Sequence, residues 1–393
     1  MSEIGSRLQE LRDEGLYRRM RMVAGPQGPR VMLDGRSVLL LCSNNYLGFA
    51  DHPRVRTAAA EAAMRYGVGA GASRLVSGNM TLHRRLEERL ADFERTERCV
   101  LFGSGYLANT GVIAALAQPG EVILSDALNH ASIIDGCRLA RAETFVYDHL
   151  DAEHLEWGLR EAGGRGSLIV TEGVFSMDGD VAPLAEIVEL ARTYDARVLV
   201  DEAHATGALG PGGRGSVAAA GLEHEVDVII GTLGKALGGY GAYACCDSET
   251  ACFLVNTARP LIFSTGPSPP SAAAALAALE LLQEEPRQVE RLQRNGRTLR
   301  DALAEHGFGV PAGDTHIVPL VVGEPEVAVE LCERALERGV FAQAIRPPTV
   351  PAGTARLRLA AMATHNPSEL LWAAGQLGAA AAEISEPALQ RAA

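Results

Sequence analysis

The sequence predicts an α/β protein with a large domain built on a mostly parallel sheet and a small C-terminal α+β domain. Between about residues 54 and 280, short apolar segments such as CVLF, SLIVTEG and DVIIGTL alternate with helical segments. Strands that alternate with helices are typical of parallel sheets. Two strands, RVLVDEA and DVIIGTL, end abruptly at polar residues. Because ligands bind at the carboxyl ends of such strands, we expect a functional site there.

The first 50 residues are expected to form a helical arm and a linking strand. Residues 1 to about 24 have the pattern of a charged helix, with Leu8, Leu11 and Leu16 on one side. A solvated amphipathic arm is the simplest interpretation of this pattern. The segment GPQGPR then breaks the helix, and the apolar run VLLL ends in the polar residues SNN.

Residues 51–285 are expected to form the large domain. Helices are predicted over 55–66 and 82–94, on either side of a glycine-rich loop. The strands CVLF, EVILS, SLIVTEG, RVLVDEA and DVIIGTL follow, with helical stretches between them. An alanine-rich helix over 272–284, after the proline-rich segment TGPSPPS, is expected to close the domain.

Residues 286–393 are expected to form the small domain. A charged helix runs to about residue 305, and HIVPLVVG, GVFAQAI and ARLRLA are predicted strands around a helix over 325–338. Arg356 and Arg358 alternate along ARLRLA, so a solvent-facing edge is one interpretation of this strand. The last residues, AAAAEISEPALQRAA, are predicted to be a helix end and a loose tail.

The composition argues against several classes of protein. A formal net charge of −13 is unlike that of a general nucleic-acid binder. The seven cysteines show no CxxC or cysteine/histidine metal spacing, so we expect reduced thiols and no metal site. No apolar run approaches ~18 residues, and no charged start precedes an apolar segment. We therefore expect a cytoplasmic enzyme with neither a nucleic-acid nor a membrane partner.

Residues 201–204 spell DEAH, which in a helicase would end a strand and hold magnesium. A nucleic-acid motor would also need the phosphate loop G-x-x-x-x-G-K-[ST]. That loop is missing, because Gly231 and Gly234 are too close together and Lys235 is followed by Ala236. The segment GVGAGAS follows a helix and lacks G-x-G-x-x-G, so it does not predict dinucleotide binding either.

Asp201 and Lys235 together predict a pyridoxal phosphate site. An aspartate at the end of a buried strand can keep a pyridine nitrogen protonated, and a lysine between glycines can supply the amine for a Schiff base. His204 could hydrogen-bond the phenolic oxygen of the ring. A strand-to-helix junction with free backbone N–H groups suits a phosphate. The expected donors to the phosphate and the ring are Ser104, Gly105, Tyr106, Ser176 and Thr232.

Each of these residues has a structural alternative. His130, in LNHAS, could be a helix-start residue as readily as a catalytic one. Asp201 alone could be a structural acid at a strand end. The occurrence of all these features in one chain favours the functional interpretation.

Nine segments of the chain resemble the α-oxoamine synthase family of pyridoxal phosphate enzymes. They are SNNYLG (43–48), GAGASRLVSG (69–78), GSGYLAN (103–109), LNHAS (128–132), TEGVFSMDGD (171–180), DEAHATG (201–207), GTLGKALGGYG (231–241), FSTGPSPP (263–270) and RPPTVPAGTARLR (346–358). The resemblance covers nearly the whole chain in family order. It implies fold type I, the aspartate aminotransferase-like fold. It also implies a pyridoxal phosphate-dependent acyltransferase that condenses an amino acid with an acyl-CoA and releases carbon dioxide.

The resemblance also implies roles for individual residues. Lys235 would carry the cofactor, Asp201 would meet the pyridine nitrogen, His130 would stack on the ring, and His204 would hold the phenolic oxygen. Arg358 would bind the amino-acid carboxylate. The remaining implied contacts are Gly105, Tyr106, Ser176 and Thr232 to the cofactor, Arg18 and Thr349 to the acyl substrate, and Asn44 and Glu172 along the wall of the site.

Ser264 and Thr265 resemble the segment that reaches the phosphate of the neighbouring subunit, which implies a homodimer with shared active sites. The segment AIRPPTVPAGTARLRL most resembles members that join L-alanine to a pimeloyl thioester, on CoA or a carrier protein, in biotin synthesis. Members that use glycine with acetyl-CoA, or serine with palmitoyl-CoA, remain alternatives. Arg74 after Ser73 also occurs in glycine-using relatives. A catalytically silent relative is disfavoured because Lys235 is present.

Overall fold

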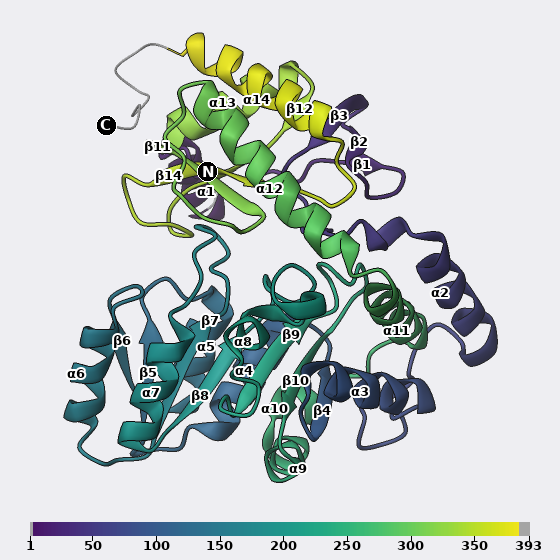
Figure 1. The fold of residues 1–393 in the computed structure, drawn as a ribbon, viewed down its shortest axis with the longest axis vertical. Helices are drawn as coiled ribbons and strands as arrows, with labels where there is room; N and C mark the ends of the chain where they lie inside the picture. Colours follow the sequence, from purple (N-terminus) through teal and green to yellow (C-terminus); the bar gives the residue numbers. More distant parts are fainter. Residues whose placement is uncertain (1–2, 385–393) are drawn as a thin grey trace. The chain divides into compact units, whose positions relative to one another are not determined.

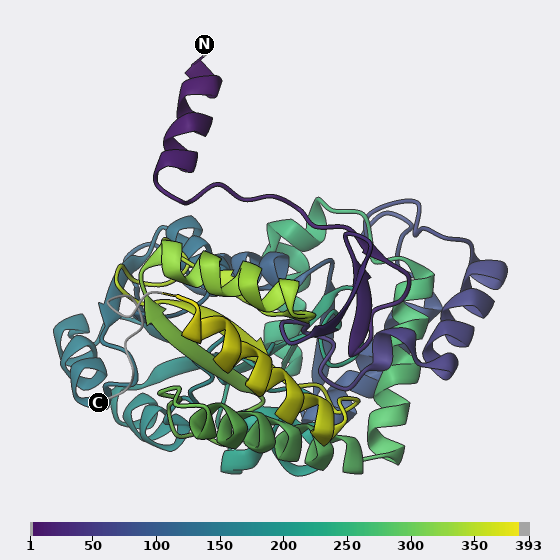
Figure 2. The ribbon, with the colours of Figure 1, turned by 90° about the horizontal axis from the view of Figure 1, so that it is seen from above.

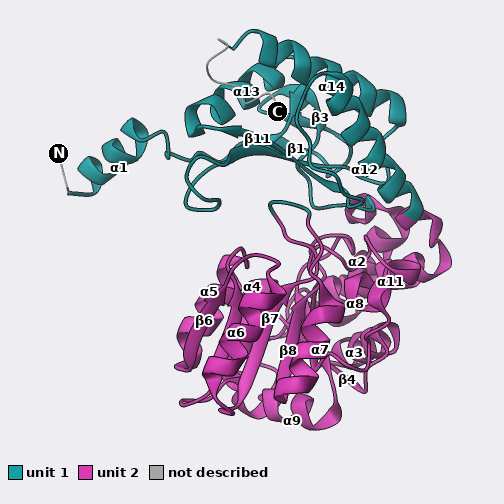
Figure 3. Cartoon of the chain, turned by 60° about the vertical axis from the view of Figure 1, so that its left-hand side comes forward, with its two compact units in different colours: residues 1–48, 177–179, 290–393 teal, residues 49–176, 180–289 magenta. Residues whose placement is uncertain are grey.

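The computed structural model describes residues 3–384, so the end of the predicted tail, 385–393, lies outside the described residues. The chain divides into two compact units (Figure 3). The large unit comprises residues 49–176 and 180–289, and the small unit comprises residues 1–48, 177–179 and 290–393. The N-terminal segment therefore belongs with the C-terminal one. The physical reason is that strand β3 (Arg36–Leu40) pairs in parallel with β12 (Val340–Phe341).

A seven-stranded sheet forms the centre of the large unit (Figure 1), with the strand order β4-β10-β9-β8-β7-β5-β6. Its strands are β4 (Arg98–Phe102), β5 (Val122–Asp126), β6 (Glu143–Tyr147), β7 (Ser167–Glu172), β8 (Ala196–Asp201), β9 (Val228–Thr232) and β10 (Ala242–Cys246). Neighbouring strands from β9 to β6 are all parallel, whereas β10 runs antiparallel to both β4 and β9. The predicted mostly parallel sheet is confirmed.

The strands β5, β7 and β10 of this sheet are buried along their whole length, as strands covered on both faces are. Leu168, Ile169 and Val170, three successive residues of β7, are all fully buried. Helices α4, α5 and α9 share one apolar cluster with the strands, and α6 packs against α7 and the strands β5 and β6. The longer helices of the unit are α2 (Pro53–Tyr66), α3 (Thr81–Glu94), α4 (Gly105–Leu116), α5 (Ala131–Ala140), α6 (Ala152–Ala162), α7 (Leu184–Tyr194), α9 (Ser248–Thr257) and α11 (Pro269–Glu284); α8 (Gly215–Ala220) and α10 (Arg259–Ile262) are short.

Side-chain caps determine where two helices of the large unit begin. The hydroxyl of Ser104 accepts the N–H of Leu107 at the start of α4, at 3.3 Å. The Nδ1 atom of His130 accepts the N–H of Ser132 at the start of α5, at 3.2 Å. Each cap satisfies a backbone donor that the first helical turn leaves unpaired. The caps fix two strand-to-helix junctions that the sequence predicted to be functional.

Among residues 3–384, the small unit contains two sheets and four helices. The sheets have the orders β1-β2-β3-β12 and β11-β14-β13. Its other strands are β1 (Val23–Ala24), β2 (Arg30–Leu33), β11 (Ile317–Gly323), β13 (Gln343–Ile345) and β14 (Ala355–Ala360), and its helices are α1 (Glu3–Asp13), α12 (Arg287–Glu305), α13 (Pro325–Glu337) and α14 (Pro367–Ala382). Apolar residues of α12, α13 and α14 pack with both sheets in one core.

The N-terminal helix is shorter than the sequence predicted. Helix α1 ends at Asp13, whereas the pattern predicted a helix to about residue 24. Gly15 adopts a φ of 65°, and its N–H donates to the carbonyl of Arg12 at 3.1 Å. A glycine in this conformation terminates a helix. None of the residues of α1 is buried, and Figure 2 shows the helix at the end of an extended segment.

Within residues 3–384, no helix combines the length and the apolar character that spanning a membrane requires.

Candidate active site

Three polar residues end adjacent strands at one edge of the large sheet. Glu172 ends β7, Asp201 ends β8 and Thr232 ends β9. Glu172 lies opposite Asp201 in the β7–β8 register, and Asp201 lies opposite Ile230 in the β8–β9 register. Because these strands are parallel, their carboxyl ends meet at one edge. The structure thus brings the two predicted motifs together.

Lys235 and His204 are in contact just beyond these strand ends. The Nζ atom of Lys235 lies 2.8 Å from Nε2 of His204. Two fully protonated groups cannot share such a hydrogen bond, so at least one of these nitrogens is an acceptor. The sequence predicts a hydrogen bond from His204 to the cofactor's phenolic oxygen; the contact with Lys235 is an additional feature of the structure. The two side chains form one proton-sharing pair.

Gly238 holds the turn that carries Lys235. Its φ is +62°, and a Cβ added there would lie 2.3 Å from the backbone nitrogen of Ala50. The N–H of Gly238 donates to the carbonyl of Lys235 at 2.9 Å. Only glycine combines this conformation with such a close approach of backbone.

Asp201 is buried and its two oxygens have separate donors. The N–H of Ala203 donates to Oδ1 at 2.9 Å, and the amide of Asn109 donates to Oδ2 at 2.6 Å. Asn109 lies on α4, inside the quoted segment GSGYLAN, and no role was predicted for it. A buried polar residue in an otherwise apolar helix was the signal that could have identified it.

Glu172 is buried beside Asp201. Its Oε2 accepts the N–H of Ser176 at 3.2 Å, while Oε1 has no hydrogen-bond partner among the described residues. Burial, reinforced by the charge of Asp201, raises the pKa of Glu172 to about 8. A buried acid with one unsatisfied oxygen is expected to face a ligand that supplies the missing partner.

His130 and Ser132 form a third part of this site. His130 Nδ1 accepts the backbone N–H of Ser132 and lies 2.7 Å from its hydroxyl. Desolvation by the surrounding protein lowers the pKa of His130; the charge of Lys235 also lowers it, and that of Asp201 opposes the shift. The ring is therefore neutral near pH 7, and its proton resides on Nε2.

The start of α4 and the loop after β9 contain the remaining predicted cofactor contacts. The first backbone donors of α4, at Gly105 and Tyr106, precede the bonds from Leu107 and Ala108 that close its first turn. The phenol of Tyr106 donates to the carboxylate of Asp135. The hydroxyl of Thr232 donates to the carbonyl of Gly241 at 3.1 Å and accepts the N–H of Gly234.

Ser264 and Thr265 follow α10 on the large unit. Thr265 is exposed and forms an isolated bridge with Ser73 in the glycine-rich loop. Exposed Phe263 precedes them. This exposed segment is the one predicted to reach a neighbouring subunit.

The predicted substrate residues Arg358 and Asn44 lie in the small unit. Arg358 donates to Oδ1 of Asn44 and to the hydroxyl of Tyr46, both at 3.1 Å. Arg358 and Arg356 are only 6% and 4% exposed, so the interpretation of ARLRLA as a solvent-facing edge is wrong. The reason is that β14 is the middle strand of its sheet. Arg356 instead pairs with Asp178.

The two predicted acyl contacts, Arg18 and Thr349, are exposed on segments that Arg346 joins. The guanidinium of Arg346 donates to the carbonyls of Gly15 and Tyr17, and its own carbonyl accepts the N–H of Thr349 at 3.1 Å. Arg346 itself is buried. It therefore ties the arm that carries Arg18 to the loop that carries Thr349.

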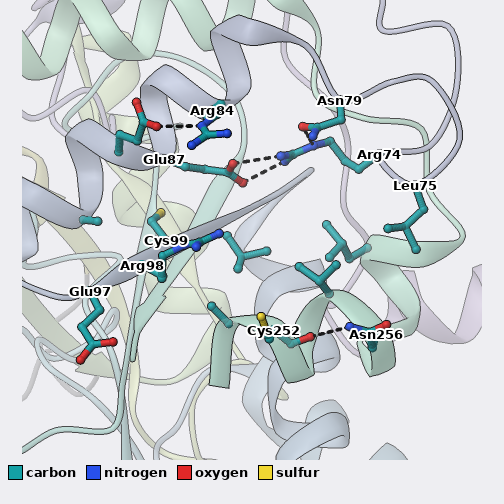
Figure 4. Close-up of a pocket in the computed structure, with 16 residues that line it drawn as sticks. Arg74, Leu75, Asn79, Arg84, Glu87, Glu97, Arg98, Cys99, Cys252 and Asn256 are labelled. Carbon is teal, nitrogen blue, oxygen red and sulfur yellow. Dashed lines mark hydrogen bonds and ion pairs between the residues drawn. The ribbon is translucent and has the colours of Figure 1, made fainter. Parts of the chain in front are cut away.

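A separate pocket of about 550 Å³ lies between α3, β4 and α9 of the large unit (Figure 4). Arg74 lines it and forms two hydrogen bonds with Glu87, both at 3.0 Å. Glu87 also accepts the N–H of Leu101 on β4, at 2.9 Å. Arg74 therefore anchors the glycine-rich loop to the sheet, which gives this residue a structural explanation.

Comparisons with known proteins agree with these motifs. Residues 36–377 match the model of the aminotransferase class I and II family. The 8-amino-7-oxononanoate synthase of Geobacter sulfurreducens is 54% identical over 370 residues, which cover 93% of this chain and 95% of the relative. The 8-amino-7-oxononanoate synthase of Citrifermentans bemidjiense is 52% identical over 378 residues, covering 95% and 97%. The structure of serine palmitoyltransferase from S. paucimobilis with a bound PLP–myriocin aldimine is similar with a TM-score of 0.92 and 34% identity, over 96% of each chain. The chain therefore belongs to the aminotransferase class I and II family and, within it, to the α-oxoamine synthases that its motifs predicted.

Proposed function

We propose that this protein is a pyridoxal phosphate-dependent acyltransferase that condenses L-alanine with a pimeloyl thioester to give 8-amino-7-oxononanoate, in the biosynthesis of biotin. The observation that carries the proposal is the position of Lys235. It is the only lysine in the sequence; all the other lysine or arginine positions are arginine. This single amine lies within hydrogen-bond distance of His204, beside strand ends that present Asp201 and Glu172. A lysine retained at one such position indicates chemistry that a guanidinium cannot perform.

The residues fit pyridoxal phosphate. The buried Oε1 of Glu172 has no partner among the described residues, Asp201 offers a carboxylate to a ring nitrogen, and the start of α4 offers backbone donors to a phosphate. When bound, pyridoxal phosphate supplies an electrophilic carbonyl and a protonated ring that withdraws electrons from the amino-acid Cα. The matched relatives with solved PLP complexes support the same cofactor.

Lys235 would hold and move the proton at the alanine Cα. Its contact with His204 provides an acceptor nitrogen in the pair, so a proton can pass between the two without a net charge entering the site. His130 would pack on the ring in its neutral form. Arg358 would bind the alanine carboxylate, with Asn44 and Tyr46 fixing its guanidinium. A fixed carboxylate sets which Cα bond is aligned for cleavage.

The acyl substrate would contact Arg18 and Thr349. Both are exposed, and both lie on segments that Arg346 holds. A cationic side chain near the acyl site suits the distal carboxylate of a pimeloyl chain. Cleavage of the thioester would release CoA or a carrier protein, and loss of the alanine carboxyl group would release carbon dioxide.

The protein would form a homodimer in which each active site receives residues from both subunits. It would reside in the cytoplasm. The exposed segment at Ser264 and Thr265 is suited to reach a second copy of the chain. All seven cysteines are free thiols, as a reducing compartment requires.

Two other members of the family are the competing functions. Serine palmitoyltransferase is favoured by the overall likeness of its structure, at 34% identity. Glycine C-acetyltransferase is compatible with Arg74 in the glycine-rich loop. The identity of 54% with an 8-amino-7-oxononanoate synthase favours the alanine reaction.

The test is release of CoA from a small matrix of substrates. Alanine, glycine and serine would each be paired with acetyl-CoA, pimeloyl-CoA and palmitoyl-CoA, and pimeloyl carrier protein would be tested with alanine. We expect the highest kcat/KM for alanine with a pimeloyl donor. Turnover only with glycine and acetyl-CoA would reject the biotin-pathway assignment and leave the family assignment intact.

A further inference from the structure

Asn109 occupies a central position among the proposed cofactor-binding residues of the large unit. It is only 1% exposed, on the face of α4 that packs against α5. Its Nδ2 atom lies 2.6 Å from Oδ2 of Asp201 and 2.9 Å from Oγ of Ser132. One side chain therefore contacts both the acid assigned to the ring nitrogen and the residue that contacts His130.

The charge of Asp201 determines how this amide is oriented. An ionised carboxylate accepts hydrogen bonds only, so an amide oxygen placed 2.6 Å from it would be repelled. The NH₂ group of Asn109 must therefore face Asp201. Its two hydrogens are then directed to Asp201 and Ser132. The Oδ1 atom is left buried without a hydrogen-bond partner among the described residues.

The same orientation gives the chain of hydrogen bonds a direction. Since Ser132 Oγ accepts from Asn109, the hydroxyl hydrogen of Ser132 is free to point at His130 Nδ1, 2.7 Å away. The backbone N–H of Ser132 donates to the same ring nitrogen. Nδ1 is thus an acceptor, and the ring proton lies on Nε2. Both residues assigned to the cofactor ring are connected through Asn109.

The close packing of α4 and α5 makes this arrangement possible. A Cβ added at Gly136 of α5 would lie 3.0 Å from the backbone oxygen of Asn109. The glycine therefore allows the two helices to approach closely enough for Ser132 to reach the Asn109 amide. An asparagine with a merely structural role would be expected to satisfy its acceptor as well as its donors.

We propose that Asn109 is a positioning residue that orients Asp201 for the ring nitrogen of pyridoxal phosphate and directs the hydroxyl of Ser132 to Nδ1 of His130. The inference rests on the proposed function, because it takes Asp201 to be the partner of that nitrogen. The hydrogen bond from the Asn109 amide fixes the carboxylate plane of Asp201, so its other oxygen contact can be directed at a protonated ring nitrogen. Asn109 touches neither the substrate nor the reacting atoms in this role.

The test compares two ligands of the apoenzyme, pyridoxal phosphate and its analogue in which carbon replaces the ring nitrogen. Dissociation constants would be measured for the wild type, Asn109→Leu, Asp201→Ala and Ser132→Ala. The wild type is expected to prefer pyridoxal phosphate. In Asn109→Leu this preference should fall by roughly 10- to 100-fold, the effect of one hydrogen bond to a charged group. In Ser132→Ala it should change by less than about threefold, because the bond to Asp201 remains.

The matched control is Asn295→Leu in the small unit. Asn295 is also buried and also uses its amide nitrogen twice, donating to the carbonyls of Met362 and His365. It should lower thermal stability without changing the ligand preference. Where Asn109→Leu fails to fold, Asn109→Ala removes the same donors without adding bulk.

Different outcomes would reject the role of Asn109 and the role of Asp201. Equal losses of affinity for both ligands in the Asn109 variants, with their preference intact, would show a structural role only and overturn the inference. A wild type that binds both ligands equally, or Asp201→Ala with an unchanged preference, would instead reject the assignment of Asp201 itself. CoA release would then show whether the proposed reaction survives that loss.

Discussion

Glu172 and Asp201 of the large unit lie at the ends of buried strands, whereas two of the four predicted site residues of the small unit lie on exposed segments. Asp201 and Glu172 are 5% and 2% exposed and are held by neighbouring strands. Arg18 and Thr349 are exposed and are held through Arg346. The difference predicts that cofactor binding depends on buried, regular elements, while the choice of acyl substrate depends on exposed segments.

The largest effect is expected for Lys235, in the large unit. Lys235→Ala should lower turnover by about 10³-fold or more and abolish the visible absorption of bound cofactor, because no other lysine can replace its amine. Lys235→Arg is the matched control: it keeps the charge but not the amine, and it should be as inactive. CoA release and absorption spectra measure both effects. Full turnover in either variant would contradict the assignment.

The next effect distinguishes the two arginines of β14. Arg358→Ala should raise the KM for alanine by about 10²-fold, because a bidentate carboxylate contact is lost. It should destabilise the protein less than Arg356→Ala, because the partners that it leaves, Asn44 and Tyr46, are uncharged. Arg356→Ala should instead destabilise the protein by about 3 kcal/mol, because it leaves the half-buried Asp178 unpaired. Steady-state kinetics and urea unfolding measure these outcomes. An unchanged KM for alanine in Arg358→Ala would remove Arg358 from the site.

A third effect concerns the turn after Lys235. Gly238→Ala should lower the free energy of unfolding by about 3 kcal/mol, because the new Cβ would collide with the backbone of Ala50. Gly163→Ala is a control with the same φ of +62°, but the nearest atom is 3.7 Å away. It should lower the free energy of unfolding by only about 1 kcal/mol. Equal losses in the two variants would show that backbone strain alone matters.

The pH dependence of stability tests the burial of Glu172. Its pKa is raised from 4.5 to about 8, chiefly by burial. Between those values the unfolded chain has lost a proton that the folded protein retains, so the free energy of unfolding falls as pH rises, by up to about 1.4 kcal/mol per pH unit. Glu172→Gln should remove this contribution, measured by urea unfolding of the apoenzyme from pH 5 to 8.

Glu94 is the matched buried acid for that experiment. Its pKa is also raised to about 8 by burial, and it accepts the hydroxyl of Tyr243 at 2.6 Å. Glu94→Gln should change the stability slope in the same direction and leave the pH dependence of cofactor binding unaltered. An altered pH dependence of cofactor binding in Glu94→Gln would contradict the placement of Glu94 outside the cofactor site.

The smallest effect is expected for the exposed acyl-contact residue Arg18. Arg18→Ala should raise the KM for the pimeloyl donor by about fivefold and leave the alanine KM and the stability unchanged, because an exposed ion pair contributes about 1 kcal/mol. The same variant tested with a neutral acyl-CoA of equal length should show no change. A rise with both donors would indicate that Arg18 holds the CoA rather than the chain end.

The sequence predicted the parts of the molecule that local patterns encode. Asp201 ends one β-branched run and Lys235 closely follows another, and the sheet and its parallel strands follow from that pattern. The burial of Arg356 and Arg358 was missed because the order β11-β14-β13 is a tertiary property. Helix α1 ended early because Gly15 adopts a positive φ that composition does not reveal. Asn109 was overlooked because its partners lie 23 and 92 residues away in the chain.

Because the chain has a single lysine, its cofactor-binding amine can be labelled selectively. Reagents that modify ε-amines have one target in the whole chain, Lys235, apart from the N-terminal amine. Borohydride reduction of the cofactor-loaded protein should therefore leave a single modified lysine-containing peptide. In the purified protein, the stoichiometry of that peptide counts the cofactor-loaded sites directly.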